Sequence, residues 1–518
     1  MPRSSLPAPE VCDQARRSRD ARFDGLFFTA VHSTRIYCRP VCPAPYARRV
    51  SYYPNAAAAE AAGYRPCLRC RPELSPSDGS WRRGDAAIAR ALALIDQGAL
   101  AEAPLAALAA RVGLGERQLR RLFVARVGAP PVGVHGTRRL LFAKQLLTET
   151  ALPVTEVAMA AGFNSLRRFN AAFQDAYRMA PGELRRHPDA AARRMHGDAL
   201  VLRLGYRPPY DFPAMLDFLR GRALPGVEAV DGDGYARVVA GRDGSPPGWM
   251  RVSAWPGAEH ALKLELHAPP AARLLDVVQR LRRMFDLDAD PGSIADALAA
   301  DPRLRPLLRA RPGLRLPGAW DGFEAAVRAV LGQQVSVAAA RTLASRIARR
   351  FGAPLPAPRA EGLDHVFPTP AALADADLVP LGLTRARADT VRTVARALLD
   401  GSVDFDPGRT LDDFVERWVQ LPGIGPWTAQ YIALRALGHP DAFPAGDLVL
   451  RKALQAGGPR PGDKALAARA EAWRPWRAYA VVQLWRDAAH PVAAAREGAP
   501  GHARRGGPRP PTPEAIRP

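Results

Sequence analysis

The hydrophobic positions of residues 85–187 recur three and four places apart, which predicts a series of amphipathic helices. Within this series, a glycine turn at residues 112–114 precedes a helical segment that begins at Glu116 and has one polar and one apolar face. The same order returns later, where a glycine turn at residues 161–163 precedes a second such segment, and a long helical stretch around residues 137–148 joins the two. The pattern predicts two related helix-turn-helix units.

The periodicity changes after this region. Residues 200–204 and 261–266 have the pattern of β-strands and residues 212–219 that of a helix, so residues 198–275 are expected to form an α+β unit. Residues 276–495 again favour helices and show little strand signal. The expected fold class is therefore multidomain α+β, with mostly helical parts.

Length and charge limit the possible functions. A chain of 518 residues is long enough for three or four domains, each with its own core. The formal net charge of +22 favours a polyanionic partner, and nucleic acid is the expected one. The sequence has no run of about 18 apolar residues and no signal-peptide core, so we expect a cytoplasmic protein that does not enter a membrane. Residues 496–518 are rich in Gly, Arg and Pro, and we expect a disordered tail there.

Four of the five cysteines are paired at short spacings, Cys38 with Cys42 and Cys67 with Cys70. Each pair lies on one tight, proline-containing turn, and two such turns can supply the four thiolates of a tetrahedral Zn2+ site. On spacing alone, the zinc is a structural staple of a small domain. Two disulfides are an alternative, although nothing marks the chain as secreted. Cys12 lies outside the set and is interpreted as incidental.

Three segments surround these cysteines: Phe23–Phe28, Thr34–Cys42 and Gly63–Cys70. With all four cysteines in register, they resemble the methylphosphotriester acceptor domain of Ada-type proteins over residues 10–75. The resemblance implies a zinc domain at residues 1–78 in which Cys38 accepts the methyl group of an alkylated DNA phosphate and becomes a thioether. Zinc would keep the sulfur deprotonated, and the thiolate is the nucleophilic form.

The resemblance also implies a change of charge at the zinc site. A Zn2+ ion with four thiolates carries two net negative charges, which repel DNA phosphates, and methylation of one sulfur leaves a single negative charge. We therefore expect methylation of Cys38 to raise the affinity for DNA. An alternative is a repair enzyme whose front half only targets it to DNA, with Cys38 as a structural ligand.

The helix-turn-helix region carries a more specific match in Ala161–Ser165, Arg168–Phe169 and Ala180–Arg185. These segments resemble an AraC-type DNA-binding domain, which implies a paired helix-turn-helix regulator at residues 85–187 and RNA polymerase at target promoters as a partner. In such motifs the second helix enters the major groove. The residues expected there are Glu116, Arg117, Gln118, Arg120, Arg121, Ser165, Arg167, Arg168 and Asn170. The alternative is an ordinary helical bundle with solvated arginines.

The C-terminal helical region contains the segment Leu421–Ala429, with glycines at Gly423 and Gly425. Glycines at these positions leave backbone N–H groups free to face a phosphate at the start of the following helix, although a simple tight turn is the alternative. Asp447 follows within a mostly apolar stretch. A helix N-cap is an equal alternative for this acid.

Three further segments accompany the hairpin and Asp447: Tyr206–Asp211, Leu331–Ala338 and Trp473–Ala480. Over residues 198–490 the chain is similar to helix-hairpin-helix DNA glycosylases of the AlkA type, the 3-methyladenine glycosylase II family. The resemblance implies a TBP-like α+β domain at residues 198–275, equivalent to the N-terminal domain of AlkA, and an all-α glycosylase domain at residues 276–495.

The same resemblance implies roles for individual residues. Asp447 matches the catalytic aspartate, which stabilises the cationic sugar while the damaged base departs. Trp427, Tyr431 and Trp485 match the aromatic lining that receives the flipped base. Gln334 matches the residue that wedges into the vacated duplex space, a position where the best-known member has an apolar residue. The backbone carbonyls expected to hold a monovalent cation are those of Val419, Leu421 and Gly423.

Two absences restrict the expected chemistry. Strand-cutting members of the superfamily have a lysine two residues after the second hairpin glycine, and this chain has Trp427 there. No imine can form, so we expect a monofunctional glycosylase. No cysteine follows Cys70, which excludes a thiolate-ligated iron–sulfur cluster in the second half and an O6-alkylguanine acceptor domain.

The sequence thus predicts a fusion of a zinc methyl acceptor, a paired helix-turn-helix regulator and a base-excision glycosylase for bases of the 3-methyladenine type. The main rival is a transcription regulator whose glycosylase half is inactive and only binds DNA. The intact Asp447 and its aromatic neighbours argue against this rival.

Overall fold

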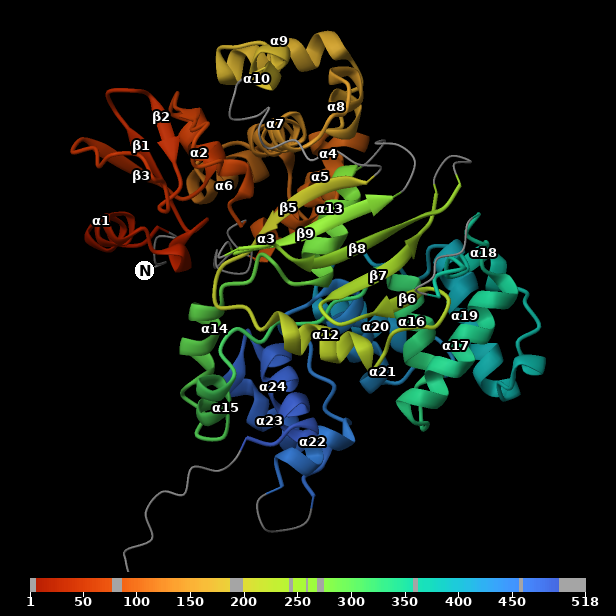
Figure 1. The fold of residues 1–518 in the computed structure, drawn as a ribbon. Helices are drawn as coiled ribbons and strands as arrows, with labels where there is room; N and C mark the ends of the chain where they lie inside the picture. The colour runs from red at the N-terminus through yellow and green to blue at the C-terminus, as the bar shows by residue number, and fades with distance from the viewer. Residues whose placement is uncertain are drawn as a thin grey trace, which may run out of the picture.

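The computed structural model describes most of the 518-residue chain (Figure 1). The described residues are 6–76, 86–186, 199–241, 246–257, 260–267, 274–356, 362–455 and 460–492. The tail expected to be disordered, residues 496–518, lies outside the described residues.

The N-terminal part is a small four-stranded sheet with a helix on one face. Its elements are α1 (Pro9–Ser18), β1 (Phe28–Val31), β2 (Ile36–Cys38), β3 (Val50–Tyr53), α2 (Ala56–Ala61) and β4 (Arg65–Pro66). The strand order is β3-β1-β2-β4, in which β1 is antiparallel to both neighbours while β2 and β4 are parallel. Phe28, Tyr37 and Tyr64 pack with the alanines of α2 and form the core.

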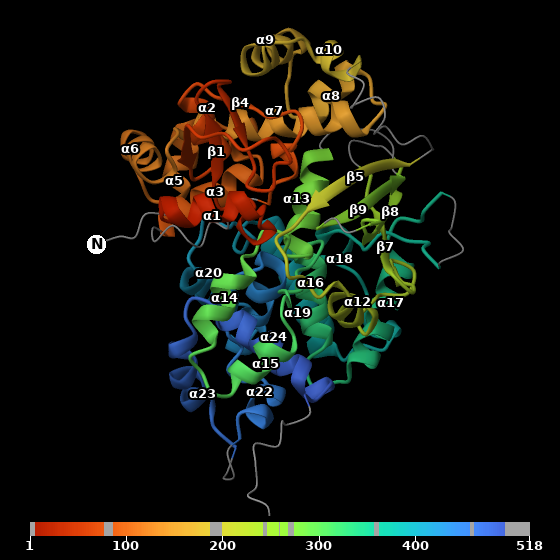
Figure 2. The same ribbon diagram turned by 60° about the vertical axis from the view of Figure 1, so that its left-hand side comes forward.

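The next part is the expected series of helices. They are α3 (Ala86–Asp96), α4 (Ala99–Glu102), α5 (Leu105–Arg111), α6 (Glu116–Val127), α7 (Pro131–Glu149), α8 (Val154–Ala160), α9 (Leu166–Tyr177) and α10 (Pro181–Arg186). Gly113 and Gly162 have φ angles of +75° and +77°, so both turns need a residue without a Cβ. The long helix α7 lies between the unit of α5 and α6 and the unit of α8 and α9 (Figures 1 and 2).

A five-stranded antiparallel sheet follows in the centre of the molecule (Figure 1). Its elements are β5 (Leu200–Gly205), α12 (Phe212–Arg220), β6 (Glu228–Val230), β7 (Gly234–Val239), β8 (Gly248–Ala254) and β9 (Ala261–His267). The strand order is β5-β9-β8-β7-β6. The hydrophobic pattern identified β5, α12 and β9 but not β6, β7 and β8. All six residues of β7 are buried, so this strand lacks the alternation that reveals a half-exposed strand.

Helix α13 (Leu274–Met284) packs on this sheet and begins two residues before the expected start of the helical region. Its apolar stripe, which includes Val278 and Leu281, joins Leu202 and Leu264 of the sheet in one buried cluster. The same cluster continues into α7 and α9 of the preceding helical part, where Phe169 is fully buried. The sheet and the second helix-turn-helix unit therefore share a core.

The C-terminal part is helical around a large buried cluster that includes Trp418 and Trp473. Its elements are α14 (Pro291–Leu298), α15 (Leu304–Ala310), α16 (Gly322–Leu331), α17 (Val337–Phe351), α18 (Pro370–Leu373), α19 (Arg385–Leu399), α20 (Leu411–Val419), α21 (Pro426–Ile432), α22 (Leu448–Ala453), α23 (Asp463–Ala470) and α24 (Arg477–Ala489). The hairpin glycines lie between α20 and α21. Within the described residues, no helix is both long and apolar enough to span a membrane.

Candidate zinc centre, exposed helices and aromatic pocket

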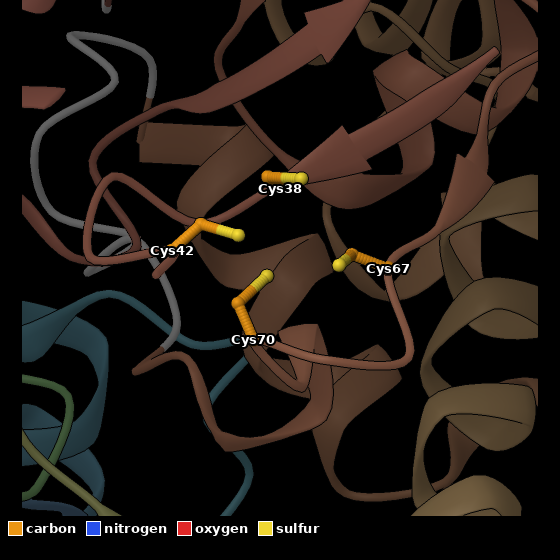
Figure 3. A group of neighbouring side chains, drawn as sticks. All are labelled: Cys38, Cys42, Cys67 and Cys70. Carbon is orange, nitrogen blue, oxygen red and sulfur yellow. The ribbon is translucent and has the colours of Figure 1, made fainter. Parts of the chain in front are cut away.

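The four paired cysteines converge on one point (Figure 3). Each sulfur atom lies within 4.8 Å of the other three. Tetrahedral zinc at Zn–S distances of about 2.3 Å separates its sulfur ligands by about 3.8 Å. The arrangement therefore fits one Zn2+ ion with Cys38, Cys42, Cys67 and Cys70 as ligands.

Strand pairing brings the two cysteine turns together. Cys38 ends β2, and Cys67 follows β4, which pairs with β2 in parallel. The backbone N–H of Cys67 donates to the carbonyl of Tyr37 across this pair at 3.0 Å. The N–H of Arg39 donates to Cys70 Sγ at 3.3 Å, as is common for a thiolate ligand. Short turns after Cys38 and Cys67 then bring Cys42 and Cys70 into the same cluster (Figure 3).

The fifth cysteine belongs to a different environment. Cys12 is fully buried in a small apolar cluster with Leu26 and Phe27. Burial, with a smaller contribution from Glu10, raises the pKa of the Cys12 thiol to about 12. Its thiol therefore stays protonated, which agrees with its interpretation as incidental.

A buried ionic cluster joins the second cysteine turn and the residues that follow it (residues 67–73, here called the zinc turn) to α7 and β5. Lys144 of α7 donates to the carbonyl of the zinc ligand Cys67 at 3.3 Å and forms an ion pair with Glu73. Arg71 pairs with Glu73 at 3.1 Å and with Glu149 of α7 at 2.5 Å. The other carboxylate oxygen of Glu149 accepts from the backbone N–H of Arg203 in β5 at 3.1 Å.

The charges of this cluster compensate one another. The side chains of Lys144 and Glu73 are each 1% exposed. Burial alone would raise the pKa of Glu73, but Lys144 and Arg71 hold it below its ordinary value. Arg207, which follows β5, adds a separate link, because its Nε donates to the carbonyl of Asp24 at 2.8 Å. The zinc turn is therefore held by groups from three parts of the chain.

The residues predicted to read DNA lie on α6 and α9. The five on α6 and the three on α9 are all exposed: Glu116, Arg117, Gln118, Arg120, Arg121, Arg167, Arg168 and Asn170. Ser165 differs, because it is half-buried and its Oγ accepts from the N–H of Arg168 at 3.4 Å as the N-cap of α9. Its side chain thus has a structural role that the sequence pattern did not reveal.

One of the two alternatives for Asp447, the helix N-cap, is present in the structure, and the catalytic role stays a prediction. Asp447 is the N-cap of α22, and its Oδ1 accepts from the N–H groups of Val449 at 2.9 Å and Leu450 at 3.0 Å. Trp485 Nε1 lies 3.2 Å from the same oxygen. The three donors fix the orientation of the carboxylate, and no described residue donates to Oδ2.

Asp447 lines a cavity of about 570 Å3 together with the predicted aromatic residues. The rings of Trp427 and Tyr431 stack at a centroid distance of 5.4 Å and an angle of 15°. Tyr431 and Trp485 lie 6.1 Å apart at 49°. The three aromatic residues and Asp447, which are far apart in the sequence, thus line the same cavity. Gln334 lies outside this set on the exposed loop between α16 and α17.

Charged residues that the sequence pattern did not single out form another wall of the cavity. Arg222, Arg328 and Arg435 line it, and Arg435 Nη1 donates to Tyr431 Oη at 3.1 Å. Burial alone would raise the pKa of Tyr431, but Arg435 and Arg222 hold it below its ordinary value. Arg328 pairs with the buried Glu228 at 2.9 Å across the boundary between sheet and helices. These arginines come from three separate segments, so no local spacing connects them.

The fold and these sites together define a helix-hairpin-helix DNA repair protein joined to an Ada-type zinc domain and a helix-turn-helix pair. Four families match the chain in this order. They are the metal binding domain of Ada at residues 11–73, a helix-turn-helix domain at 108–187, the AlkA N-terminal domain at 201–321 and the HhH-GPD superfamily of base excision DNA repair proteins at 327–478.

Individual relatives cover the same parts. The chain is 42% identical over 489 residues to the probable bifunctional transcriptional activator/DNA repair enzyme AlkA of Mycobacterium tuberculosis, which is 93% of this chain and 97% of the relative. It is 37% identical over 295 residues to DNA-3-methyladenine glycosylase 2 of Escherichia coli, or 54% of this chain and 95% of that protein. It is 43% identical over 122 residues to the bifunctional transcriptional activator/DNA repair enzyme Ada of Escherichia coli, or 23% of this chain and 32% of Ada.

The chain therefore belongs to the family of bifunctional transcriptional activator/DNA repair enzymes represented by the Mycobacterium tuberculosis protein. The predicted fusion of Ada-type, AraC-type and AlkA-type parts is confirmed, and so is the predicted fold class. The predicted combination of DNA repair with transcriptional regulation is confirmed at the same level. The roles of single residues and the limits of the domains stay predictions.

Proposed function

We propose that the C-terminal half releases alkylated bases of the 3-methyladenine type from double-stranded DNA by hydrolysis of the N-glycosidic bond. The observation that carries this proposal is the orientation of Asp447, whose Oδ1 is held by three donors at the edge of an aromatic cavity. A base flipped into the cavity would stack on the Trp427 and Tyr431 rings. The adjacent carboxylate would then stabilise the cationic sugar as the base departs, and water would complete the hydrolysis.

The reaction is proposed to stop at the abasic site. The residue at the position of the strand-cutting lysine is Trp427, and the cavity lining in the described part of the chain contains arginines but no lysine. A guanidinium stays protonated and forms no imine with the opened sugar. The support for a monofunctional glycosylase is thus the absence of an amine beside Asp447.

A direct test follows from this chemistry. Duplex DNA with one alkylated purine should lose the free base when it is incubated with the protein, and the strand should break only after alkali treatment. Strand breaks before alkali would contradict the monofunctional proposal. A complete lack of base release would favour the rival, in which the second half only binds DNA.

We propose that Cys38 is the methyl acceptor of the zinc centre. The sulfur cluster fits a Zn2+ ion that would hold all four sulfurs as thiolates, and Cys38 matches the acceptor position of the Ada-type motif. Methylation removes one negative charge close to DNA, so it should strengthen binding. Peptide mass mapping after incubation with methylphosphotriester DNA should place the methyl group on Cys38 alone.

The exposed residues of α6 and α9 are proposed to contact DNA, with RNA polymerase as the partner at target promoters. Their support is exposure on the second helix of each helix-turn-helix unit. A footprint that persists after Arg167→Ala and Arg168→Ala, with unchanged affinity, would contradict the role of α9.

The backbone carbonyls of Val419, Leu421 and Gly423 are proposed to bind a monovalent cation beside a DNA phosphate.

A further inference from the structure

The side chain of Gln333 connects the hairpin to the loop of residues 332–336, here called the wedge loop because it carries Gln334. Gln333 precedes Gln334 on the loop between α16 and α17, but its side chain turns away from the exposed tip. Its Nε2 donates to the carbonyl of Gly423 at 2.9 Å and to Thr428 Oγ1 at 3.1 Å. Both protons of the amide are used, one on the hairpin and one on α21.

Helix α19 supports both sides of this connection. Arg387 donates to the backbone carbonyl of Gln333 at 2.7 Å. Thr390, one turn later on α19, packs under the hairpin, where a Cβ on Gly423 would lie 2.1 Å from Thr390 Oγ1. Gly423 also has a φ angle of +87°, so this approach requires glycine. The wedge loop and the hairpin are thus both positioned on the same helix.

The backbone of Gln334 makes this support necessary. Gln334 has a φ angle of +56°, which is unfavourable for a residue with a Cβ and persists only where the surroundings hold it. The residue is exposed, so its own side chain does not provide that restraint. The restraint comes from the preceding residue, through the bonds of Gln333 to Gly423, Thr428 and Arg387.

We infer that Gln333 is a positioning residue that couples the grip of the hairpin on the DNA backbone to the insertion of Gln334 into the duplex. The inference rests on the proposed glycosylase function and on the wedge role that the resemblance implies for Gln334. When the hairpin binds a phosphate, Gln333 fixes the position of Gln334 relative to that phosphate. Gln333 is not among the described residues that line the cavity around Asp447, so it acts on extrusion of the base and not on cleavage of the bond.

The inference is tested with the full chain and two variants that remove the donors but keep the size of the side chain. They are Gln333→Met and Gln333→Leu. Gln420→Met is the matched control, because Gln420 is an exposed glutamine near the hairpin whose Nε2 donates to the carbonyl of Glu416 at 3.3 Å and to no other described residue. The substrates are a duplex with an alkylated purine opposite its normal partner and a duplex with the same lesion opposite an abasic site, where no partner base has to be displaced.

Loss of two neutral hydrogen bonds should slow excision from the paired duplex about tenfold to a hundredfold in both Gln333 variants. Excision opposite the abasic site should change by less than about threefold, because the wedge is not needed there. The control should match wild type on both substrates. Equal losses on both substrates, or no loss on the paired duplex, would overturn the inference.

A second measurement separates this inference from the proposed function. Fluorescence of 2-aminopurine placed beside the lesion reports unstacking, and it can be followed in an Asp447→Asn background where no base should be released. Gln333→Met should reduce the fluorescence increase on binding, while Gln420→Met should not. If wild type releases no base, the proposed function fails, yet this fluorescence difference still decides the role of Gln333. Thr428→Val, which removes one acceptor of Gln333, should show an intermediate reduction.

Discussion

Replacement of Asp447 by asparagine separates the chemical role of this residue from its structural one. Asn and Asp are comparable N-cap residues, so Asp447→Asn can keep the bonds from Val449 and Leu450 with its amide oxygen. The helix loses only a charge near its N-terminus, which costs about 0.3–1 kcal/mol. The melting temperature should therefore change little. Asp447→Ala also removes the cap, so it should lower stability by about 0.5–2 kcal/mol.

The effect of Asp447→Asn on the reaction should be much larger. A carboxylate about 4 Å from a cationic sugar, at an effective dielectric constant of about 20, stabilises it by about 4 kcal/mol. Removal of the charge should thus slow base release by about a hundredfold to a thousandfold. DNA affinity should hold or rise slightly, because a negative charge near the backbone is gone.

The assay is single-turnover release of 3-methyladenine from alkylated duplex DNA at saturating enzyme, with thermal unfolding and DNA affinity measured on the same preparation. Near-normal release by Asp447→Asn would show that the catalytic acid lies elsewhere. Loss of release together with a large fall in melting temperature would show that the residue acts through folding. Only slow release in a stable, DNA-binding variant agrees with the proposed role.

Three further predictions concern the zinc centre and the buried charges. Lys144→Met should lower the free energy of unfolding by about 3–5 kcal/mol, because it leaves the buried carboxylate of Glu73 with too little positive charge beside it. Lys263→Met, at a partly exposed ion pair, should change the free energy of unfolding by less than about 1 kcal/mol. Equal changes for the two variants in chemical denaturation would contradict this difference. Elemental analysis of protein purified without chelator should find one Zn2+ per chain, and a strong chelator should lower the melting temperature; a protein without zinc would contradict the site built from Cys38 and its partners. Burial would raise the pKa of Glu228, but Arg328 and Arg237 hold it at about 2, below its ordinary 4.5. The ionised Glu228 therefore stabilises the fold above pH 4.5, and this stabilisation is lost as the pH falls toward 2. Unfolding curves of Glu228→Gln should show less acid sensitivity than those of wild type in that window.

Local spacing was enough to predict the parts of the site that depend on short segments. The proximity of Cys38 to Cys42, and of Cys67 to Cys70, follows from two tight turns. Spacing does not show that the turns meet, because that contact depends on the parallel pairing of β2 and β4. Asp447 shows a related limit, since its sequence position was compatible with both a helix cap and a catalytic acid. The structure shows that one oxygen can serve as the cap while the group still lines the cavity.

Contacts between distant segments could not be predicted from patterns. The buried cluster of Arg71, Glu73, Lys144 and Glu149 joins parts that hydrophobic periodicity treats as separate. Each of these residues alone is typical of a solvated helix face or turn. Their burial follows from the packing of three parts of the chain, and mutual compensation of charge makes that burial possible. The strand β7 was missed for a similar reason, because burial on both faces removes its alternation.

The most direct test of the whole account is the fate of methyl groups when the purified protein meets DNA that carries them on both bases and phosphates. With labelled methyl groups, the account predicts two products in one incubation. Free 3-methyladenine should be released with turnover, and label should be retained on the protein at no more than one methyl group per chain, on the peptide that contains Cys38. Label only in free base would contradict the acceptor role, and label only on the protein would contradict the glycosylase.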